Sequence, residues 1–350
     1  MVGEDLSSSQ LAEAPRSPLT PDAFVAQSNT LATLLDAATV RLGMDRWFWG
    51  EGVCLLAAVR LAQARGTPTP QWVLRFFEPH LERDPIVEHV NNLAPVAALA
   101  ELCEHEFEGR GRGLLERTME WCLQAPRTAD GALEHWPGAV WADTAYMAAQ
   151  PLLRVGRVLQ RDDLIEEAVR QWLLHAEALQ DPATGLVAHG TTGGILMPWR
   201  WGRANAWMAL TGADLLTYGY GGDEVRQRIE LQLSSLIEYL PEYGIWDVIV
   251  DDLPETRGII ETSASAGLAA ALLRVGRKLD RDDFLAAGRR ALLASMAYVD
   301  QDGWLTRVSA GTVLQLVPFG YSVIRDDRPQ PWGQGLALEA LAAWHETTTP

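Results

Sequence analysis

Residues 152–168 read LLRVGRVLQRDDLIEEA, and residues 272–288 read LLRVGRKLDRDDFLAAG. In each segment an apolar helix runs through a glycine, turns at an Arg-Asp-Asp step and continues as an amphipathic helix. The two copies are 120 residues apart, which corresponds to two helical hairpins. A hairpin that recurs at a fixed spacing predicts an architecture built by repeating one unit.

Helical periodicity extends over the rest of the chain and predicts twelve helices. Every second helix is apolar on all faces, as in GVCLLAAVRLAQARG, whereas the others are amphipathic, as in DDLIEEAVRQWLLHAEAL. A helix without a polar face is normally buried, and an amphipathic one covers it. The sequence therefore predicts an all-α protein, an (α/α)6 toroid with six inner and six outer helices. The expected helix ranges are 23–43, 50–66, 69–83, 92–106, 109–124, 142–157, 160–179, 203–218, 222–240, 261–277, 280–298 and 333–346.

Domain organisation and location follow from composition. The 350 residues are 48% apolar, which is sufficient for one large core. We expect a disordered lead-in over residues 1–21 and a single barrel domain over 22–346. The N-terminal segment has neither a basic start nor an apolar stretch typical of a secretory signal, so a cytoplasmic location is predicted.

The charge of the chain limits its partners. The net charge is −17 and the pI is near 4.8, which argues against nucleic acid and against a membrane as partners. An anionic substrate would need a local cationic clamp. The three cysteines, Cys54, Cys103 and Cys122, lie far apart within apolar helices, so buried free thiols are expected rather than a disulfide or zinc site. Lys278 is the only lysine.

The inner helices of such a toroid run parallel, so the loops that enter them meet at one mouth. The loops expected there, 125–141, 181–202, 241–260 and 299–332, are long, and long loops in compact domains are usually functional. Ten of the fourteen tryptophans fall at this end, where they could be platforms for sugar rings or plugs of the barrel. They are Trp47, Trp49, Trp136, Trp141, Trp199, Trp201, Trp207, Trp246, Trp304 and Trp332.

Polar residues at the same end are either helix caps and satisfied core groups or parts of a site. For Asp143 the internal repeat helps to distinguish a structural role from a role in a site, because the equivalent position 120 residues later is Ser263. Either residue can cap a helix, so the fold alone does not demand a carboxylate at 143. The polar candidates are Glu51, Asn91, Asn92, His135, Asp143, His189, Arg200, Arg203, Asn205, Glu261 and Gln334.

Common motifs for other chemistries are missing from the sequence. It has no HExxH or paired cysteines for a metal, no glycine-rich phosphate loop after a strand, and no GxSxG elbow for a nucleophilic serine. We therefore expect no metal and no cofactor.

Five motifs then occur in one order: QAPRTADGALEHWPGAVWADTAYMA, DPATGLVAHG, WRWGRANAW, ETSASA and GQGLALEALAAW. Over residues 45–346 this pattern resembles the unsaturated glucuronyl and rhamnogalacturonyl hydrolases of glycoside hydrolase families 88 and 105, with family 105 the nearer match. The resemblance implies an (α/α)6 barrel and hydrolysis of a 4-deoxy-hex-4-enuronosyl residue. In these enzymes an aspartate protonates C4, water adds at C5, and the hemiketal opens and releases the attached sugar or aglycone.

The resemblance also implies residue roles. Asp143 would be the general acid, Arg203 would hold the substrate carboxylate, Trp207 would stack on the ring and His189 would contact the sugar. An aspartate is usual where this chain has Asn91, which puts the usual substrate in doubt and removes a charge that would keep Asp143 protonated. The full expected substrate-binding set is Asn91, Asn92, His135, Trp141, His189, Trp201, Arg203, Trp207, Trp49 and Trp332.

The expected partner is an unsaturated uronyl oligosaccharide or glycoside, and a homodimer is left open. Two alternatives are kept: another (α/α)6 glycosidase or sugar epimerase, for which two acids or a histidine pair would be needed at the mouth, and a glycan-binding relative without activity.

Overall fold

The computed structural model describes residues 15–325 and 328–348. Each of the twelve expected helical positions is helical. The inner helices are α3 (Trp49–Arg65), α5 (Ala94–Leu102), α7 (Ala142–Met147) with α8 (Ala149–Leu159), α10 (Gly202–Thr217), α12 (Thr262–Leu279) and α14 (Pro331–Thr348). The outer helices are α2 (Pro21–Val40), α4 (Gln71–Glu82), α6 (Arg112–Gln124), α9 (Asp162–Leu179), α11 (Gly222–Glu238) and α13 (Asp282–Met296).

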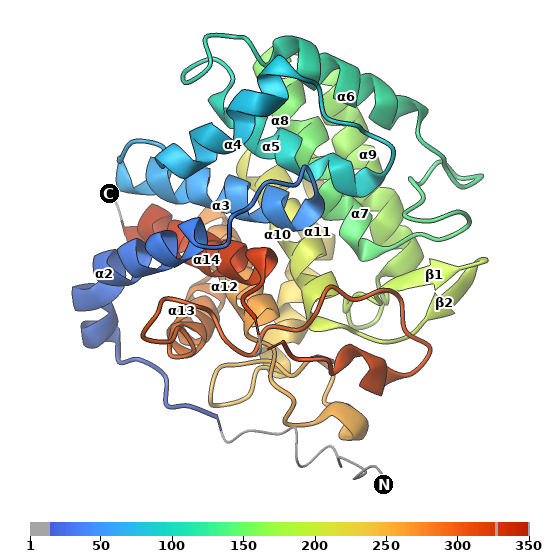
Figure 1. The fold of residues 1–350 in the computed structure, drawn as a ribbon. Helices are drawn as coiled ribbons and strands as arrows, with labels where there is room; N and C mark the ends of the chain where they lie inside the picture. Colours follow the sequence, from blue (N-terminus) through green and yellow to red (C-terminus); the bar gives the residue numbers. More distant parts are fainter. Residues whose placement is uncertain (1–14, 326–327, 349–350) are drawn as a thin grey trace, which may run out of the picture.

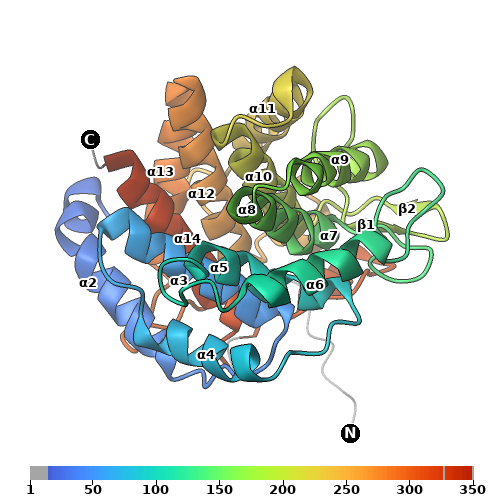
Figure 2. The same ribbon diagram turned by 90° about the horizontal axis from the view of Figure 1, so that it is seen from above.

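The inner helices form a closed ring. Each contacts the next in the order α3, α5, α8 and α7, α10, α12, α14, and α14 returns to α3. Figure 1 shows the ribbon from the side, and in Figure 2 the outer helices surround this ring. The predicted (α/α)6 toroid is therefore confirmed.

Small residues allow the inner helices to approach closely. A Cβ atom on Gly52 of α3 would come within 2.5 Å of the Pro95 backbone nitrogen in α5. A Cβ on Gly335 of α14 would come within 2.7 Å of the Cα atom of Cys54 in α3. Both distances are shorter than van der Waals contact, so a side chain at either position would push the ring apart.

The sequence repeat is also a structural repeat. Gln160 and Asp280 close α8 and α12 with φ angles of 55° and 52°, so both copies end in a left-handed residue. Each copy then has the same Arg-Asp pair beside the next helix, Arg161 with Asp163 and Arg281 with Asp283.

One inner helix is interrupted. The expected helix 142–157 breaks at Ala148 into α7 and α8. Pro151 lies in the first turn of α8 and has no N–H to donate to the Met147 carbonyl, which explains the break. As a result α7 is a short helix whose first turn projects Asp143 at the mouth.

Shorter elements build the loops at the mouth. They are the 3-10 helices η1 (Val90–Asn92), η2 (Pro254–Thr256) and η3 (Pro318–Tyr321), and a hairpin of β1 (Gly190–Thr192) and β2 (Ile195–Met197), which pairs Gly190 with Met197.

The chain before α2 lies partly outside the described residues, since residues 1–14 of the expected disordered lead-in are not described. Residues 15–20 contact the barrel: the Arg16 N–H donates to the Tyr298 hydroxyl at 2.8 Å, and the Leu19 N–H donates to the Leu293 carbonyl at 3.2 Å. Within the described residues, no helix has the length and apolar character needed to cross a bilayer.

Candidate active site

A cavity of about 230 Å³ opens among the N-terminal ends of α3, α7 and α10, η1 and the loop after Ser309. Seven of the eleven predicted site residues line it, and Asp143 is the only carboxylate among its lining residues. The lining consists of Phe48, Trp49, Asn91, His135, Trp136, Trp141, Asp143, Trp201, Arg203, Gly311, Thr312 and Val313.

Asp143 is not a helix cap. Trp141 occupies the N-cap position of α7, and no backbone N–H among the described residues donates to the Asp143 carboxylate. The first N–H of α7, that of Ala142, instead donates to the His189 carbonyl at 2.9 Å. The equivalent helix α12 is capped by Glu261, which accepts a hydrogen bond from the Ala264 N–H. The Asp143 side chain is thus left for the cavity, and 16% of it is exposed.

His189 links Asp143 to Tyr321. Its Nε2 atom lies 3.1 Å from Oδ2 of Asp143, and its Nδ1 atom lies 2.8 Å from the Tyr321 hydroxyl. That hydroxyl already accepts a hydrogen bond from the Gln315 N–H at 3.2 Å, so its own proton is directed at Nδ1. The arrangement fits an imidazole that carries its proton on Nε2 and donates it to Asp143.

The pKa of Asp143 reflects two opposed effects. Burial raises the pKa, but the hydrogen bond from His189 and the electrostatic effects of His189, His135 and Arg203 together outweigh burial and hold the pKa below its usual 3.8. In the free protein Asp143 is therefore a carboxylate at neutral pH.

Arg203 brings a buried positive charge to the cavity wall. One of its terminal nitrogens donates to the Ser309 carbonyl and hydroxyl, and the other donates to the Ala310 carbonyl at 2.7 Å. Oε1 of Glu261 lies 3.6 Å from Nη1 of Arg203. The Cζ atom of Arg203 lies over the Trp201 ring, 4.4 Å from the ring centroid. Burial lowers the pKa of Arg203 to about 10, so it remains cationic at neutral pH.

His135 and Trp141 form a stacked pair with ring centroids 4.4 Å apart. The Nδ1 atom of His135 lies 2.9 Å from the Thr144 hydroxyl, and burial lowers the pKa of this histidine to about 3. His135 is thus neutral at physiological pH and contributes a hydrogen-bonding group rather than a charge. Gly190 allows this packing, because a Cβ atom there would come within 2.6 Å of the Trp141 ring.

Three residues that line the cavity each carry a buried N–H donor without a partner among the described residues. These donors are the Nε1–H groups of Trp141 and Trp201 and the Nε–H of Arg203. A buried N–H without a partner costs about 1–3 kcal/mol, and such groups in a cavity favour a ligand that supplies acceptors. The Asn91 side chain also lacks a hydrogen bond within the described chain, although its backbone N–H donates to His89. The cavity thus suits a ligand rich in oxygen acceptors.

Four predicted binding residues do not line the cavity. His189 lies behind Asp143. Trp207 is buried with its ring against Tyr146, and Asn92 uses its side chain to bond Trp47 and the backbone before η1. Trp332 stacks behind Trp49 with centroids 4.5 Å apart. From these positions Trp207 supports the core and Asn92 caps a turn, so the predicted stacking of Trp207 on a sugar does not follow from this geometry.

Other polar candidates also have structural roles. Asn205 and Gln334 each hydrogen-bond loop backbone, and Arg200 pairs with Asp181 at 3.0 Å. Glu51 is buried, and burial raises its pKa, but it faces a neighbouring cavity beside Arg46 rather than the cavity that holds Asp143.

Tyr321 was not predicted from the sequence. It lies at the end of η3 in the long loop 299–332, and no helical periodicity or motif identifies it. The only available signal was the length of that loop, because the contact with His189 joins positions 132 residues apart.

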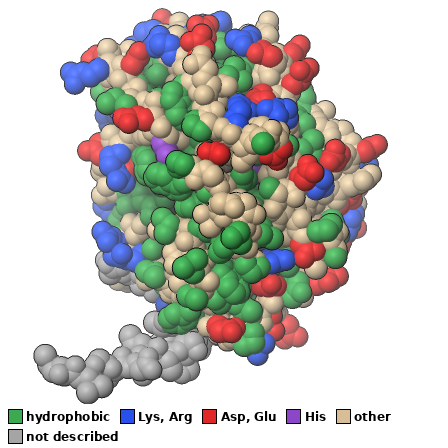
Figure 3. Space-filling model, turned by 90° about the vertical axis from the view of Figure 1, so that its right-hand side faces the viewer, with side chains coloured by type: hydrophobic (Ala, Val, Ile, Leu, Met, Phe, Trp, Pro, Cys, Tyr) green, Lys and Arg blue, Asp and Glu red, His purple; other side chains and the backbone are tan. Residues whose placement is uncertain are grey.

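Exposed apolar side chains lie on loops at the same end of the barrel as the cavity. Figure 3 views the side of the molecule that carries the β1–β2 hairpin and η3, and apolar side chains gather on this face. We call this set the apolar rim; it comprises Trp136, Ile195, Leu196, Val313, Leu316, Val317 and Phe319. Trp136 and Val313 also line the cavity, so the rim continues into it.

Comparisons with known proteins agree on one family. The model for glycosyl hydrolase family 88 matches residues 28–348. The unsaturated rhamnogalacturonyl hydrolase YesR of Bacillus subtilis (strain 168) is 37% identical over 238 residues, which is 63% of this chain and 66%, just under two thirds, of that protein. A possible member of the GH105 family from Klebsiella pneumoniae has a TM-score of 0.84 at 25% identity, with all of both chains covered. The fold also matches unsaturated glucuronyl hydrolase from Bacillus sp. GL1, with a TM-score of 0.72 at 17% identity over 90% of this chain and 95% of that chain.

Proposed function

The chain belongs to glycosyl hydrolase family 88, and from this membership and the cavity around Asp143 we propose that it is a glycoside hydrolase acting on a 4,5-unsaturated uronyl residue. The sugar at the non-reducing end would occupy the cavity, and the attached sugar or aglycone would leave through the mouth. The relative YesR, named as an unsaturated rhamnogalacturonyl hydrolase, supports this substrate class.

The proposed reaction adds water to a vinyl ether. Asp143 gives its proton to C4, and the cation that forms at C5 is stabilised by the ring oxygen. Water adds at C5 while a base, the Asp143 carboxylate, takes its proton. The resulting hemiketal opens to a ketone at C5, and the hemiacetal left at C1 expels the alcohol of the leaving group.

The single observation that carries this proposal is one carboxylate in a cavity with three unpartnered N–H donors. Direct hydrolysis at C1 normally uses two carboxylates, about 5–10 Å apart. Enol ether hydration needs only one, which first donates a proton and then accepts one. Arg203 and the indole N–H groups would hold the uronate carboxylate and hydroxyls.

Substrate binding would have to raise the pKa of Asp143. A bound uronate would bring its own negative charge beside Arg203, which weakens the effect of that arginine on Asp143, and it would displace water from the carboxylate. Both changes favour the protonated acid. Asp143 takes this proton from solvent, because a neutral imidazole that gave up its Nε2 proton would be left as an anion.

The apolar rim supports a leaving group with an apolar face. A 6-deoxy sugar such as rhamnose has a methyl group at the position where other hexoses have a hydroxymethyl group, and an aromatic aglycone is still less polar. We favour the rhamnosyl leaving group because of the similarity to YesR. Residues 22–346 would form the catalytic domain, and a cytoplasmic location and a homodimer stay predictions.

The test is to incubate the protein with a panel of unsaturated uronyl disaccharides and follow the near-ultraviolet absorbance of the conjugated alkene. We expect absorbance to fall with the wild type and kcat to fall at least about a hundredfold in Asp143→Asn. Asp223→Asn, an exposed position in the first turn of α11, is the matched control and should stay active.

The site of hydration is tested with ¹⁸O-labelled water. Label at C5 of the product supports the proposed reaction. Label at C1 would instead indicate an ordinary glycosidase, and stable absorbance with every disaccharide would overturn the proposed function.

A further inference from the structure

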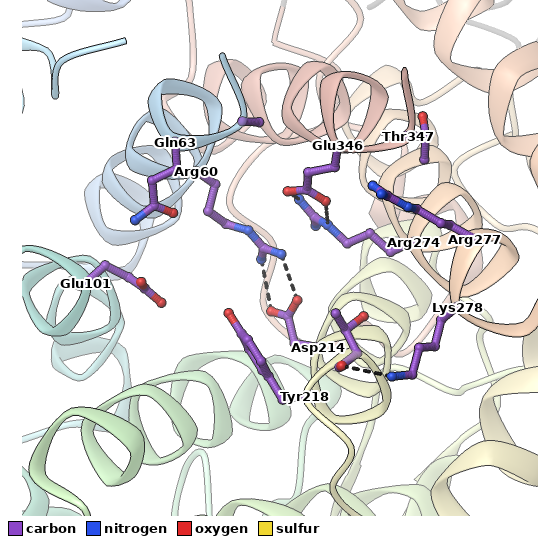
Figure 4. Close-up of a pocket in the computed structure, with 12 residues that line it drawn as sticks. Arg60, Gln63, Glu101, Asp214, Tyr218, Arg274, Arg277, Lys278, Glu346 and Thr347 are labelled. Atoms are coloured by element: carbon purple, nitrogen blue, oxygen red, sulfur yellow. Dashed lines mark hydrogen bonds and ion pairs between the residues drawn. The ribbon is translucent and has the colours of Figure 1, made fainter. Parts of the chain in front are cut away.

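A second cavity, of about 550 Å³, lies at the other end of the barrel. Its wall is built from the last turns of α3, α10, α12 and α14, and Figure 4 shows the side chains that line it. Along α3, Trp49 lines the mouth and Gln63 lines this basal cavity. Fourteen residues of helix separate them, or about 21 Å at 1.5 Å per residue, so the two cavities are distinct sites.

Buried ion pairs form the floor of the basal cavity. Arg60 donates two hydrogen bonds to Asp214 at 2.8 and 2.9 Å, and Arg154 reaches the same carboxylate at 2.9 Å. Arg274 donates two more to Glu346, at 2.7 and 2.9 Å. The acceptors of the floor are therefore already engaged by three arginines.

The remaining hydrogen-bonding groups of the wall include several donors. Arg277 makes no hydrogen bond or ion pair with the described part of the chain, and Lys278 makes one, to the Thr217 carbonyl at 3.2 Å. The Tyr218 hydroxyl and the Gln63 amide also have no side-chain hydrogen bond within residues 15–325 and 328–348. In Figure 4 Arg277 and Lys278 extend from α12 at the edge of the cavity.

The side chains that line the cavity carry a small excess of positive charge. Four cationic and three acidic side chains line the cavity, although the chain carries a net charge of −17. The carbonyl ends of α3, α10 and α12 meet here and add partial negative charge, which favours cationic side chains in the last turns of these helices. Arg60 is paired with Asp214 and Arg274 with Glu346, so among the described residues Arg277 and Lys278 are the cations of the wall without an acidic partner.

The internal repeat indicates that the fold does not require Lys278. In the earlier copy, LLRVGRVLQ, the equivalent residue is Val158, and Arg157 occupies the position of Arg277. The guanidinium of Arg157 lies 3.6 Å from the centroid of the Tyr218 ring, so it is engaged, whereas Arg277 is not. The only lysine of the chain thus stands where the same helical hairpin elsewhere has valine.

We propose that the basal cavity binds a small multivalent oxyanion, a phosphate or a polycarboxylate, between Arg277 and Lys278 above the Arg60–Asp214 and Arg274–Glu346 pairs. An oxyanion supplies the acceptors that Arg277, Lys278, Tyr218 and Gln63 lack, and a volume of this size accommodates a small metabolite. A neutral sugar offers no charge to the excess cations. The site is independent of the chemistry at Asp143.

Because Lys278 is the only lysine, amine-directed acylation modifies one side chain. Its rate is measured by peptide mass spectrometry on the full chain at fixed ionic strength, with inorganic phosphate, citrate or glycerol added and the N-terminal amine as internal reference. At ten times the dissociation constant we expect acylation of Lys278 to slow about tenfold, since only the unoccupied fraction reacts. Slowing by phosphate alone or by citrate alone supports the proposal and identifies the class of anion.

Three variants test where the anion binds, with calorimetric titration of the same anions as the measurement. Arg277→Gln and Lys278→Gln should each weaken affinity about tenfold. Arg289→Gln, an exposed position on α13 with the same change in charge, should leave affinity within about twofold. The proposal is overturned if neither anion slows acylation of Lys278, or if Arg289→Gln weakens binding as much as Arg277→Gln.

Discussion

The Nε2 atom of His189 lies 3.1 Å from Oδ2 of Asp143, and this contact is the main opposition to burial, which alone would raise the pKa of the acid. His189 is itself oriented by Tyr321, whose hydroxyl lies 2.8 Å from Nδ1. In the proposed reaction the Asp143 carboxyl group must donate a proton, but it is held in its ionised form until a substrate arrives. The protonation of Asp143 is the property that mutations should alter most directly.

Tyr321→Phe removes the hydroxyl that orients His189. We expect kcat to fall about tenfold while KM stays within about threefold, because the ring remains but Nδ1 loses its partner and the imidazole can carry its proton on either nitrogen. The measurement is the pH dependence of kcat, in which the limb governed by Asp143 should shift. Tyr239→Phe, at a partly exposed position after α11, is the control. An unchanged pH profile in Tyr321→Phe would show that His189 is oriented without the hydroxyl.

Asn91→Asp places a second carboxylate in the lining of the cavity that holds Asp143. A second negative charge in the cavity raises the pKa of Asp143, by about one unit for a neighbouring like charge. The proposed reaction requires protonated Asp143, so the rate should fall as pH rises through the pKa of Asp143 in the complex. The variant should therefore keep kcat to a pH about one unit higher than the wild type. Asn91→Ser is the uncharged control, and a profile of Asn91→Asp that coincides with that control would contradict the electrostatic argument.

The fold was accessible from the sequence because its determinants are local. The small residues of the inner helices and the Arg-Asp-Asp turn can each be recognised in a short stretch of sequence. Gln160 and Asp280 end the first helix of the two repeat copies in the same conformation. The break at Ala148 was missed, although Pro151 marks it. A proline at this position is compatible with one long, bent helix or with two short helices, so the sequence pattern did not predict the break.

Only part of the candidate site could be predicted from the sequence. Asp143 and Arg203 lie in first turns of inner helices, whose direction the toroid fixes, and both reach the cavity. Trp207 is four residues after Arg203, one helical turn deeper, and packs in the core instead. Tyr321 depends on how a loop of more than thirty residues folds back on His189, and no local rule determines that path.

The apolar rim should contribute to binding of the leaving group rather than to the chemical step. Leu316→Ser combined with Val317→Ser removes two of its most exposed members, at 79% and 58% exposure. For a rhamnosyl substrate we expect KM to rise several-fold with kcat unchanged, which is the pattern of a lost uniform binding interaction. The measurement is kcat and KM for two substrates that differ only in a rhamnosyl or a glucosyl leaving group. Val25→Ser on α2 is the control for substitution of an exposed valine. An equal rise in KM for both leaving groups would argue against recognition of an apolar face.

Asp214 should be a main determinant of stability at the base of the barrel. It is 1% exposed, and burial raises its pKa, but the charges of Arg60 and Arg154 outweigh burial and hold the pKa well below 3.8. A carboxyl group whose pKa is lowered by folding stabilises the protein above its unfolded pKa, near 3.9, and this contribution is lost as pH falls below that value. Asp214→Asn leaves two buried arginines short of a counter-charge and should cost about 3–5 kcal/mol at pH 7.

The loss is measured by urea unfolding at pH values from 7 down to 3, and the difference between wild type and Asp214→Asn should shrink towards the acidic end. Asp163→Asn provides the comparison, since its pair with Arg161 is about half exposed and should contribute less than about 1 kcal/mol. Equal losses in the two variants would mean that the basal ion pairs are no more important to the fold than a surface pair. A larger loss in Asp214→Asn, declining with acid, is expected because its partners Arg60 and Arg154 are buried.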